Sequence, residues 1–114
     1  MTNLTPYQIK KYDVTQKLLN ELADLESRQI LFSIIKHAQN VTDISISNKI
    51  PLSTVYSKLK SLERLSLAYV EKIEVIEGSS RKIKYYRSRI KRADISISKQ
   101  TPELTLLENN KNSK

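Results

Sequence analysis

The sequence predicts a mainly α-helical domain with a small β-hairpin (class α+β), in the order helix, turn, helix, wing. Three observations over residues 22–84 favour it: apolar residues at helical spacing, a proline (Pro51) between two such segments, and a basic hairpin after them. At 114 residues the chain can build one core but not two. We therefore expect a flexible arm over residues 1–12, a winged helix-turn-helix domain over 13–98 and a largely disordered tail over 99–114.

The first helix is expected to begin at Asp13, a residue type that often caps helix N-termini. Apolar residues then recur at steps of four, four and three from Val14 to Leu25, which places them on one side of a helix. Leu19 widens this stripe, so the helix can cover more than one neighbour. Packing within the domain and contact with a partner subunit both account for that width. The candidate dimerisation residues are Val14, Leu18, Leu19 and Leu22.

A second helix and a short third segment follow. Ser27 can cap the second helix, whose apolar spacing continues to Asn40, and Thr42 can cap a short helix before the proline. The pentapeptide Asp-Ile-Ser-Ile-Ser occurs at 43–47 and again at 94–98. By itself it alternates like a strand. We expect the first copy to be helical, because a capping residue precedes it and a turn and helix follow it.

The next helix is expected to begin at Ser53 or Thr54 and to carry a polar, positive outer face. Val55, Leu59 and Leu62 fall on its inward side, and hydroxyls and cations lie across from them. Short hydroxyls let a helix approach a groove floor and can bond to base edges or phosphates. An ordinary solvated helix face is the alternative. The candidate DNA-contacting residues here are Ser53, Thr54, Tyr56, Ser57, Lys58, Lys60, Ser61 and Arg64.

A hairpin is expected where the spacing changes from helical to alternating, with its turn at Gly78, the only glycine of the chain. From Arg81 to Arg92 seven cations occur without an acid among them. Such a run can neutralise phosphates along the backbone or at the minor groove. A solvated edge strand that charge protects against aggregation is the alternative. The candidate DNA contacts of this wing are Ser79, Ser80, Arg81, Lys82 and Lys84.

Two further expectations concern the strands. Because successive strand residues face opposite ways, one of the adjacent tyrosines should be buried and the other exposed, and we expect Tyr85 to share the inward face of Ile83. After Ile90 the chain reads as extended. Beyond a candidate strand at 104–107, the tail is rich in Asn and Lys and should be disordered.

Composition argues against catalysis and against a resident metal. The chain has no cysteine, which excludes disulfides and thiolate metal sites. His37, its only histidine, is expected to be solvated near a helix end, and Glu21, Asp24 and Glu26 are expected to form a solvated acidic surface. One glycine rules out a glycine-rich phosphate loop. We therefore expect no enzyme activity, no metal and no cofactor.

Charge and hydropathy indicate the expected partners. The net charge of +8 favours polyanions such as double-stranded DNA. The longest nearly unbroken apolar run, residues 30–35, is far shorter than the roughly 20 residues of a membrane span. The first ten residues are polar and do not form a secretory signal. We expect a soluble cytoplasmic protein without a membrane partner.

Three segments resemble ArsR-type winged helix regulators. Residues 22–31 (LADLESRQIL) are similar to the start of the first core helix, 50–59 (IPLSTVYSKL) to the turn and recognition helix, and 79–86 (SSRKIKYY) to the wing. The resemblance spans about residues 14–90 and is closest to small archaeal members. It implies a homodimeric DNA-binding transcription regulator. It places Ser53, Thr54, Tyr56, Ser57 and Lys58 toward the major groove and Arg81 and Lys82 toward the minor groove or backbone.

The chain departs from this family in three ways. It lacks the cysteines of the metal-sensing branch, so that metal response is not implied. Ser66 or Ala68 replaces the usual glycine before the first wing strand. The chain after Ile90 reads as extended where the family has a closing dimerisation helix, which leaves the N-terminal helix as the main support for a dimer. An architectural DNA binder of weak sequence specificity and a winged-helix protein-interaction module are the alternative functions.

Overall fold

The structure, a computed structural model, describes residues 6–110 and confirms the α+β class. β1 and β2 form one antiparallel hairpin, the wing, and β3 and β4 form a second one. In chain order the elements are α1 (Pro6–Ala23), α2 (Leu25–Ser33), α3 (Val41–Asn48), α4 (Leu52–Arg64), β1 (Ala68–Val75), β2 (Lys82–Ser88), β3 (Ile90–Ser96) and β4 (Glu103–Glu108).

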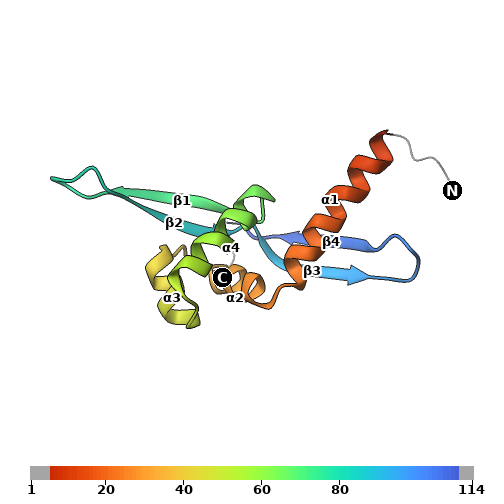
Figure 1. Ribbon diagram of the computed structural model, residues 1–114, viewed down its shortest axis with the longest axis horizontal. Coiled ribbons are helices and arrows are strands. Elements are labelled where there is room, and N and C mark those ends of the chain that lie inside the picture. The colour runs from red at the N-terminus through yellow and green to blue at the C-terminus, as the bar shows by residue number, and fades with distance from the viewer. Residues whose placement is uncertain (1–5, 111–114) are drawn as a thin grey trace.

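The molecule is elongated. Its principal extents are 61 × 29 × 27 Å and its radius of gyration is 16.4 Å, against about 13 Å for a compact domain of this length. Figure 1 shows the cause: α2, α3 and α4 form the centre, the wing projects from one side, and α1 and the β3–β4 hairpin project from the other. The wing and the second hairpin therefore lie at opposite ends of the molecule.

The core lies where the three central helices meet the bases of the strands. α4 contributes Val55, Leu59 and Leu62, all of them buried, which confirms its predicted inward face. Fully buried residues of α2 and α3 complete the helical part of this core: Ile30, Leu31, Ile34 and Ile44. A turn joins α3 to α4, so the helix-turn-helix order expected from the sequence is present.

α1 begins earlier than the sequence suggested. It starts at Pro6, so residues 6–12 are helical where a flexible arm was expected, and Asp13 lies within the helix and does not cap it. Proline suits a first helical turn, because its missing N–H has no partner there in any case and its φ is already helical. Residues 1–5 lie outside the described range. The expected domain boundary at residue 13 thus falls inside α1.

The N-caps of α2 and α3 also differ from those predicted. Asp24 caps α2, since its Oδ2 accepts from the backbone N–H of Ser27 at 2.9 Å. The Ser27 hydroxyl, expected to be the cap, donates instead to the Glu21 carboxylate. α2 ends at Ser33, and Asn40 caps α3 in place of Thr42, accepting from the Asp43 N–H at 2.8 Å.

α4 starts without a side-chain cap. Its N-cap residue is Pro51, and neither Ser53 nor Thr54 takes the capping role expected of them, because both already lie inside the helix. The backbone of Pro51 has φ −54°, so the proline fixes the chain direction at the helix start.

Two helices end on residues with positive φ that are not glycine, Lys49 (φ 55°) and Ser66 (φ 60°). After α4 the N–H of Leu67 donates to the Leu62 carbonyl at 2.8 Å and that of Ser66 to the Glu63 carbonyl at 3.0 Å, the paired bonds of a Schellman motif. Glycine is favoured at this position, and Ser66 is one of the two residues that the sequence placed where the family has glycine.

Ser66→Gly should therefore stabilise the fold, by about 0.5–1 kcal/mol, because glycine adopts positive φ without strain. Urea unfolding monitored by circular dichroism measures this difference. The control is Ser57→Gly in the exposed middle of α4, which should cost about 0.5–1 kcal/mol. Destabilisation by both substitutions to a similar extent would contradict the interpretation.

The adjacent tyrosines are arranged opposite to the prediction. Tyr86 is the buried one, 9% exposed, while Tyr85 and Ile83 are half-buried on the other face. The physical reason is position: the inner end of β2 reaches the helices, where Tyr86 and Gln39 exchange backbone hydrogen bonds of 2.8 and 3.0 Å. Burial raises the pKa of the Tyr86 hydroxyl.

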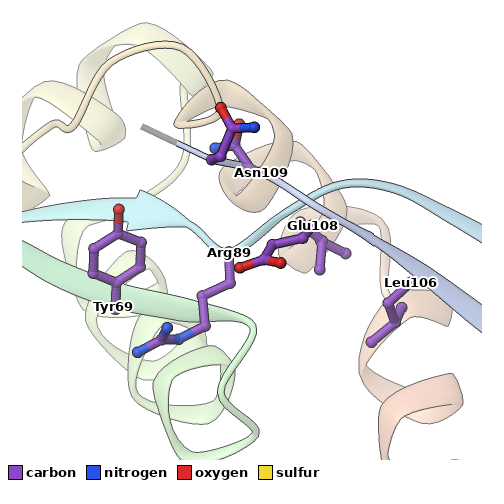
Figure 2. A pocket seen from close by; sticks show the side chains of 7 residues that line it. Tyr69, Arg89, Leu106, Glu108 and Asn109 are labelled. Atoms are coloured by element: carbon purple, nitrogen blue, oxygen red, sulfur yellow. The ribbon is translucent and has the colours of Figure 1, made fainter. Parts of the chain in front are cut away.

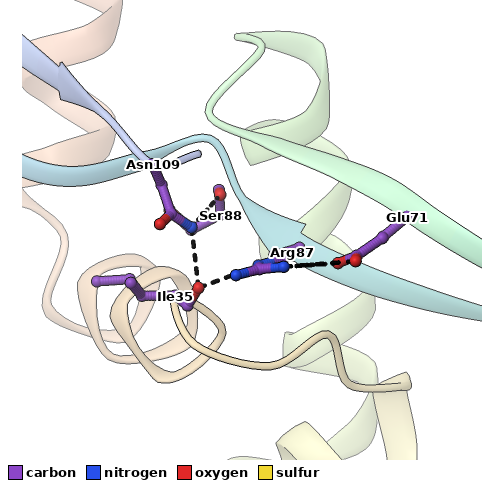
Figure 3. A network of polar contacts seen from close by, with 5 residues as sticks. All are labelled: Ile35, Glu71, Arg87, Ser88 and Asn109. Atoms are coloured by element: carbon purple, nitrogen blue, oxygen red, sulfur yellow. Dashed lines mark hydrogen bonds and ion pairs between the residues drawn. The ribbon is translucent and has the colours of Figure 1, made fainter. Parts of the chain in front are cut away.

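The candidate strand at 104–107 is present as β4, and a polar junction fixes its end to the core (Figure 3). The Asn109 side-chain amide donates to the carbonyls of Ile35 and Ser88, both at 2.9 Å. Arg87 Nε donates to the same Ile35 carbonyl at 3.1 Å. The predicted strand is therefore confirmed, whereas the disorder expected after it is wrong for Glu108, which pairs with β3, and for Asn109, which is bonded to the core. Residues 111–114 lie outside the described range.

Candidate nucleic-acid interface

The outer face of α4 is open to solvent. Four of the predicted contact residues, Ser53, Tyr56, Ser57 and Lys60, recur at positions that share one side of the helix and are exposed. Arg64, near the helix C-terminus, is exposed as well, whereas Thr54, Lys58 and Ser61 are half-buried. The structure therefore separates the predicted set into an outward stripe and residues turned toward neighbouring elements.

Sequence reasoning missed two apolar residues of the helix-turn-helix unit, Ile46 and Leu52. Ile46 in α3 is 71% exposed, and Leu52 at the start of α4 is 45% exposed. Helical geometry could have found the first, because Ile46 lies two residues, about 200°, from the buried Ile44. Exposed aliphatic groups suit contact with thymine methyls in the major groove.

Lys58 is paired within the protein. Its Nζ lies 3.0 Å from Asp24 Oδ2, the carboxylate that also caps α2. The backbone hydrogen bond from Ser27 and then that from Lys58 lower the pKa of the Asp24 carboxyl, and Asp24 in turn raises the pKa of Lys58. Glu21 and Asp24 are thus bonded groups beside a groove of about 420 Å³ between α1 and α4, which corrects the expectation of a simple solvated acidic surface.

Asp24→Ala should destabilise the fold by about 1–2 kcal/mol at pH 7, because the α2 cap is lost. Asp24→Asn is the matched control, since its amide oxygen can still cap while the charge is gone, and it should cost less. A carboxyl with a lowered pKa stabilises above its unfolded-state pKa and loses that effect as the pH falls through the folded value. The difference between wild type and Asp24→Asn should accordingly shrink below about pH 4 in thermal unfolding. A difference that does not change with pH would count against the ion pair.

The wing exposes all of its predicted contact residues: Ser79, Ser80, Arg81, Lys82 and Lys84. Gly78 turns the hairpin with φ 78°, as predicted. The turn is tightened by the Ser79 hydroxyl, which accepts from the Arg81 N–H at 3.1 Å.

The strand register gives the wing two unlike faces. Lys84 is opposite Ile73 and Lys82 is opposite Val75, and residues that pair directly share a face. Ile73 and Val75 are 53% and 62% exposed, and sequence reasoning did not select them. On the opposite face Lys72 lies 3.9 Å from Glu74 and 5.3 Å from the Tyr85 ring centroid. The face with Lys82 and Lys84 therefore carries cations beside exposed aliphatic groups.

Three of the other four cations of the basic run are engaged within the protein, and the fourth, Lys91, is exposed. Arg87 is 6% exposed and lies 3.4 Å from Glu71, Arg89 lies 4.7 Å from the Tyr69 ring centroid, and Arg92 lies 2.8 Å from Asp94. The seven cations are therefore not one continuous surface. The outer part of the wing is where exposed cations of this run lie close together in the sequence: Arg81, Lys82 and Lys84.

A second groove, of about 560 Å³, lies at the base of the wing beside β4 (Figure 2). Its walls include Tyr69, Arg89, Leu106, Glu108 and Asn109.

Within residues 6–110 no group of three or more His, Asp or Glu side chains is arranged to hold a metal ion. No helix in that range is long and apolar enough to cross a membrane.

Comparison with solved structures identifies the fold. NolR from Sinorhizobium fredii superimposes with a TM-score of 0.61 at 20% sequence identity, over 77% of this chain and 81% of that one. The homodimeric winged helix-turn-helix DNA-binding domain of Mb0332 from Mycobacterium bovis, described as a possible ArsR-family transcriptional regulator, gives 0.60 at 22% identity, over 77% and 75%. No protein-family model and no curated protein matches the sequence. The chain therefore has the winged helix-turn-helix fold.

Proposed function

We propose that the protein is a sequence-specific DNA-binding transcription regulator that places α4 in the major groove and the wing on the minor groove or backbone. One observation carries this proposal: α4 is the second helix of a helix-turn-helix unit, its outer stripe of polar residues is exposed, and the same chain has an exposed basic wing. The net charge of +8 and the DNA-binding description of Mb0332 support it. We place this function in the cytoplasm, without an enzymatic activity.

A homodimer belongs to this proposal, since one of the similar structures is homodimeric and two copies would read two half-sites about 34 Å apart. Of the four candidate dimerisation residues in α1, Val14 is the exposed one and Leu18 and Leu19 are half-buried. Leu22 is 4% exposed and belongs to the core of its own chain. In the proposed dimer Leu22 would hold α1 in place on its own domain, and Val14 would contact the partner subunit directly.

Selection of binding sites from random duplexes tests sequence readout. Tyr56→Ala and Ser57→Ala should each relax the preference at the base pairs they contact, by about 1–3 kcal/mol per position, because base-edge contacts carry specificity. Thr105→Ala in the distant β4 strand is the control and should select the wild-type sequence. If all three variants select the same site as wild type, α4 is not the reading element.

An architectural role is the second candidate, and the exposed pair Ile73 and Val75 favours it. Apolar side chains flanked by cations are typical of proteins that kink DNA from the minor groove. Competition with random duplex separates the two functions. A regulator should prefer its selected site by about 10³-fold or more, whereas an architectural protein should bind both with similar affinity.

A further inference from the structure

The groove at the base of the wing lies where the two hairpins meet (Figure 2). Its walls come from β1, from the link between β2 and β3 at Arg89, and from β4 and the residues after it. The Arg89 backbone joins these parts, because its N–H donates to the Leu67 carbonyl at 2.8 Å and its carbonyl accepts from the Asn109 N–H at 2.7 Å. A molecule held in this groove would therefore contact both hairpins at once.

The groove carries one cation and one acid that are not paired with each other. Arg89 and Glu108 are both exposed, and neither forms an ion pair with another described residue. Figure 2 shows the Arg89 side chain turned toward Tyr69 and the Glu108 side chain entering from β4. The Tyr69 ring, 4.7 Å from the guanidinium carbon, orients this cation through its face and leaves the N–H donors available. One unpaired group of each sign suits a ligand that carries both charges.

An apolar wall lies beside the acid. Leu106 and Glu108 are two residues apart in β4, so their side chains lie on the same face of the hairpin. Leu106 is 36% exposed, and Ile90, directly opposite Glu108, is buried. Both apolar residues line the groove. An aliphatic group of a ligand could therefore be buried here while its charged groups meet Arg89 and Glu108.

Asn109 adds an acceptor that has no donor. It lines the same groove, and its side-chain nitrogen already donates to the carbonyls of Ile35 and Ser88. Its Oδ1 is buried and has no hydrogen-bond partner within residues 6–110. A buried acceptor without a donor is unfavourable. Closure of this end of the groove around a ligand with N–H donors would therefore be favoured, which agrees with an ammonium group beside Glu108.

The same groups argue against other classes of ligand. A nucleotide or another polyanion requires several cations, whereas Arg89 is the one cation that lines the groove and Glu108 would repel a phosphate. A metal ion requires several ligating side chains, and the described residues hold no such group. The volume of about 560 Å³ falls in the range of roughly 300–1,000 Å³ that is usual for small-molecule sites. A small zwitterion with an apolar side chain fits the groove in charge and in size.

We propose that this groove binds a free α-amino acid with an apolar side chain. Arg89 donates to the carboxylate of the ligand, Glu108 accepts from its ammonium group, and Leu106 and Ile90 cover its side chain. No predicted DNA-contact residue of α4 or the wing lines the groove, so the site is additional to the DNA interface. As the effector site of a regulator it rests on the proposed function, but binding of the amino acid does not require DNA.

Isothermal titration calorimetry of the full chain without DNA tests this proposal, with L-leucine as the probe. Wild type should bind L-leucine with a dissociation constant of about 1 mM or tighter. Isocaproate lacks the ammonium group and isoamylamine lacks the carboxylate. Each should bind about tenfold more weakly or worse, because each loses hydrogen bonds to a charged group. Absence of leucine binding, or equal affinity for the three compounds, would overturn the proposal.

Variants locate the binding. Arg89→Gln and Glu108→Gln should each weaken leucine binding about tenfold or more. Lys91→Gln and Glu103→Gln are matched controls, because they remove the same charges from exposed positions of the same hairpin outside the groove, and they should bind like wild type. Circular dichroism establishes that each variant is folded, and the two analogues test the wild-type chain in any case.

If Arg89→Gln binds leucine as tightly as Lys91→Gln does, the groove is not the site and the proposal is wrong. A wild type that binds leucine but no DNA would instead contradict the proposed function and leave this site standing. A wild type that binds DNA but no leucine would contradict the site alone.

Discussion

Replacing Arg81, Lys82 and Lys84 together by alanine should make the salt dependence of DNA binding shallower by about three in the slope of log K against log salt concentration. Each cation that neutralises a phosphate contributes a slope of about −0.9 through counterion release. All three side chains are exposed on the wing. Affinity should fall for specific and random duplexes alike, because phosphate contacts carry no sequence information. Fluorescence anisotropy titrations over a range of salt concentrations measure both quantities.

A charge-matched variant provides the control. Lys36, Lys72 and Lys99 are exposed cations outside the proposed contact face, and Lys72 lies on the opposite face of the same wing. Their joint replacement by alanine lowers the net charge equally but should leave the slope near that of wild type. If both triple variants change the slope by the same amount, net charge alone attracts the DNA and the wing has no special part in binding.

Arg87→Met should lower the free energy of unfolding by about 2–3 kcal/mol, the largest stability effect expected of any cation of this chain. Arg87 is 6% exposed, and its loss removes a charge-assisted hydrogen bond to Ile35 and leaves Glu71 without its ion-pair partner. Urea unfolding measures the change. Arg89→Met is the matched control: Arg89 is exposed and contacts the Tyr69 ring, so the cost should be about 0.5–1 kcal/mol.

The shared acceptor gives this prediction a second readout. Arg87 and Asn109 both donate to the Ile35 carbonyl, so either one can satisfy it when the other is removed. The double variant Arg87→Met/Asn109→Ala should therefore be less stable than the sum of the two single effects predicts. Strict additivity would show that the two donors act independently.

The sequence predicted the elements whose signals are local. The inward set of α4 follows from a regular helical period, and Gly78 marks the wing turn because a tight hairpin requires positive φ. The cap of α2 was mispredicted because two residues that can cap a helix, Asp24 and Ser27, stand close together at its start. Asp24 caps this helix while also pairing with Lys58 of α4, a tertiary contact that local pattern does not reveal.

The repeated pentapeptide shows the same dependence on context. The copy at 43–47 is helical, as predicted, because Asn40 caps it and Ile44 packs in the core. The copy at 94–98 begins in β3, where β4 supplies the hydrogen-bond partners. Its strand conformation depends on pairing with residues seven to eleven positions later, in the strand that was predicted at 104–107.

For the candidate interface, exposure could be predicted but partnership could not. The polar stripe of α4 and the wing tip are exposed as expected. Lys58 and Arg87 look like their basic neighbours in the sequence, yet each is bonded to an acid from another element. The exposed Ile73 and Val75 were not predicted as contact residues, because an alternating strand pattern assigns apolar residues to a core. In the structure, no core covers these two side chains on the outer wing.

The bond between Lys58 and Asp24 joins the midpoint of α4 to the residue that starts α2. This ion pair therefore ties the middle of α4, the helix proposed to read DNA, to the start of α2. In the proposed dimer, one inserted base pair between half-sites would shift the second by about 3.4 Å and about 35°. If α4 keeps this position, we expect the DNA to absorb that mismatch by twisting or bending, so the proposed dimer would be sensitive to the distance between half-sites as well as to their sequence.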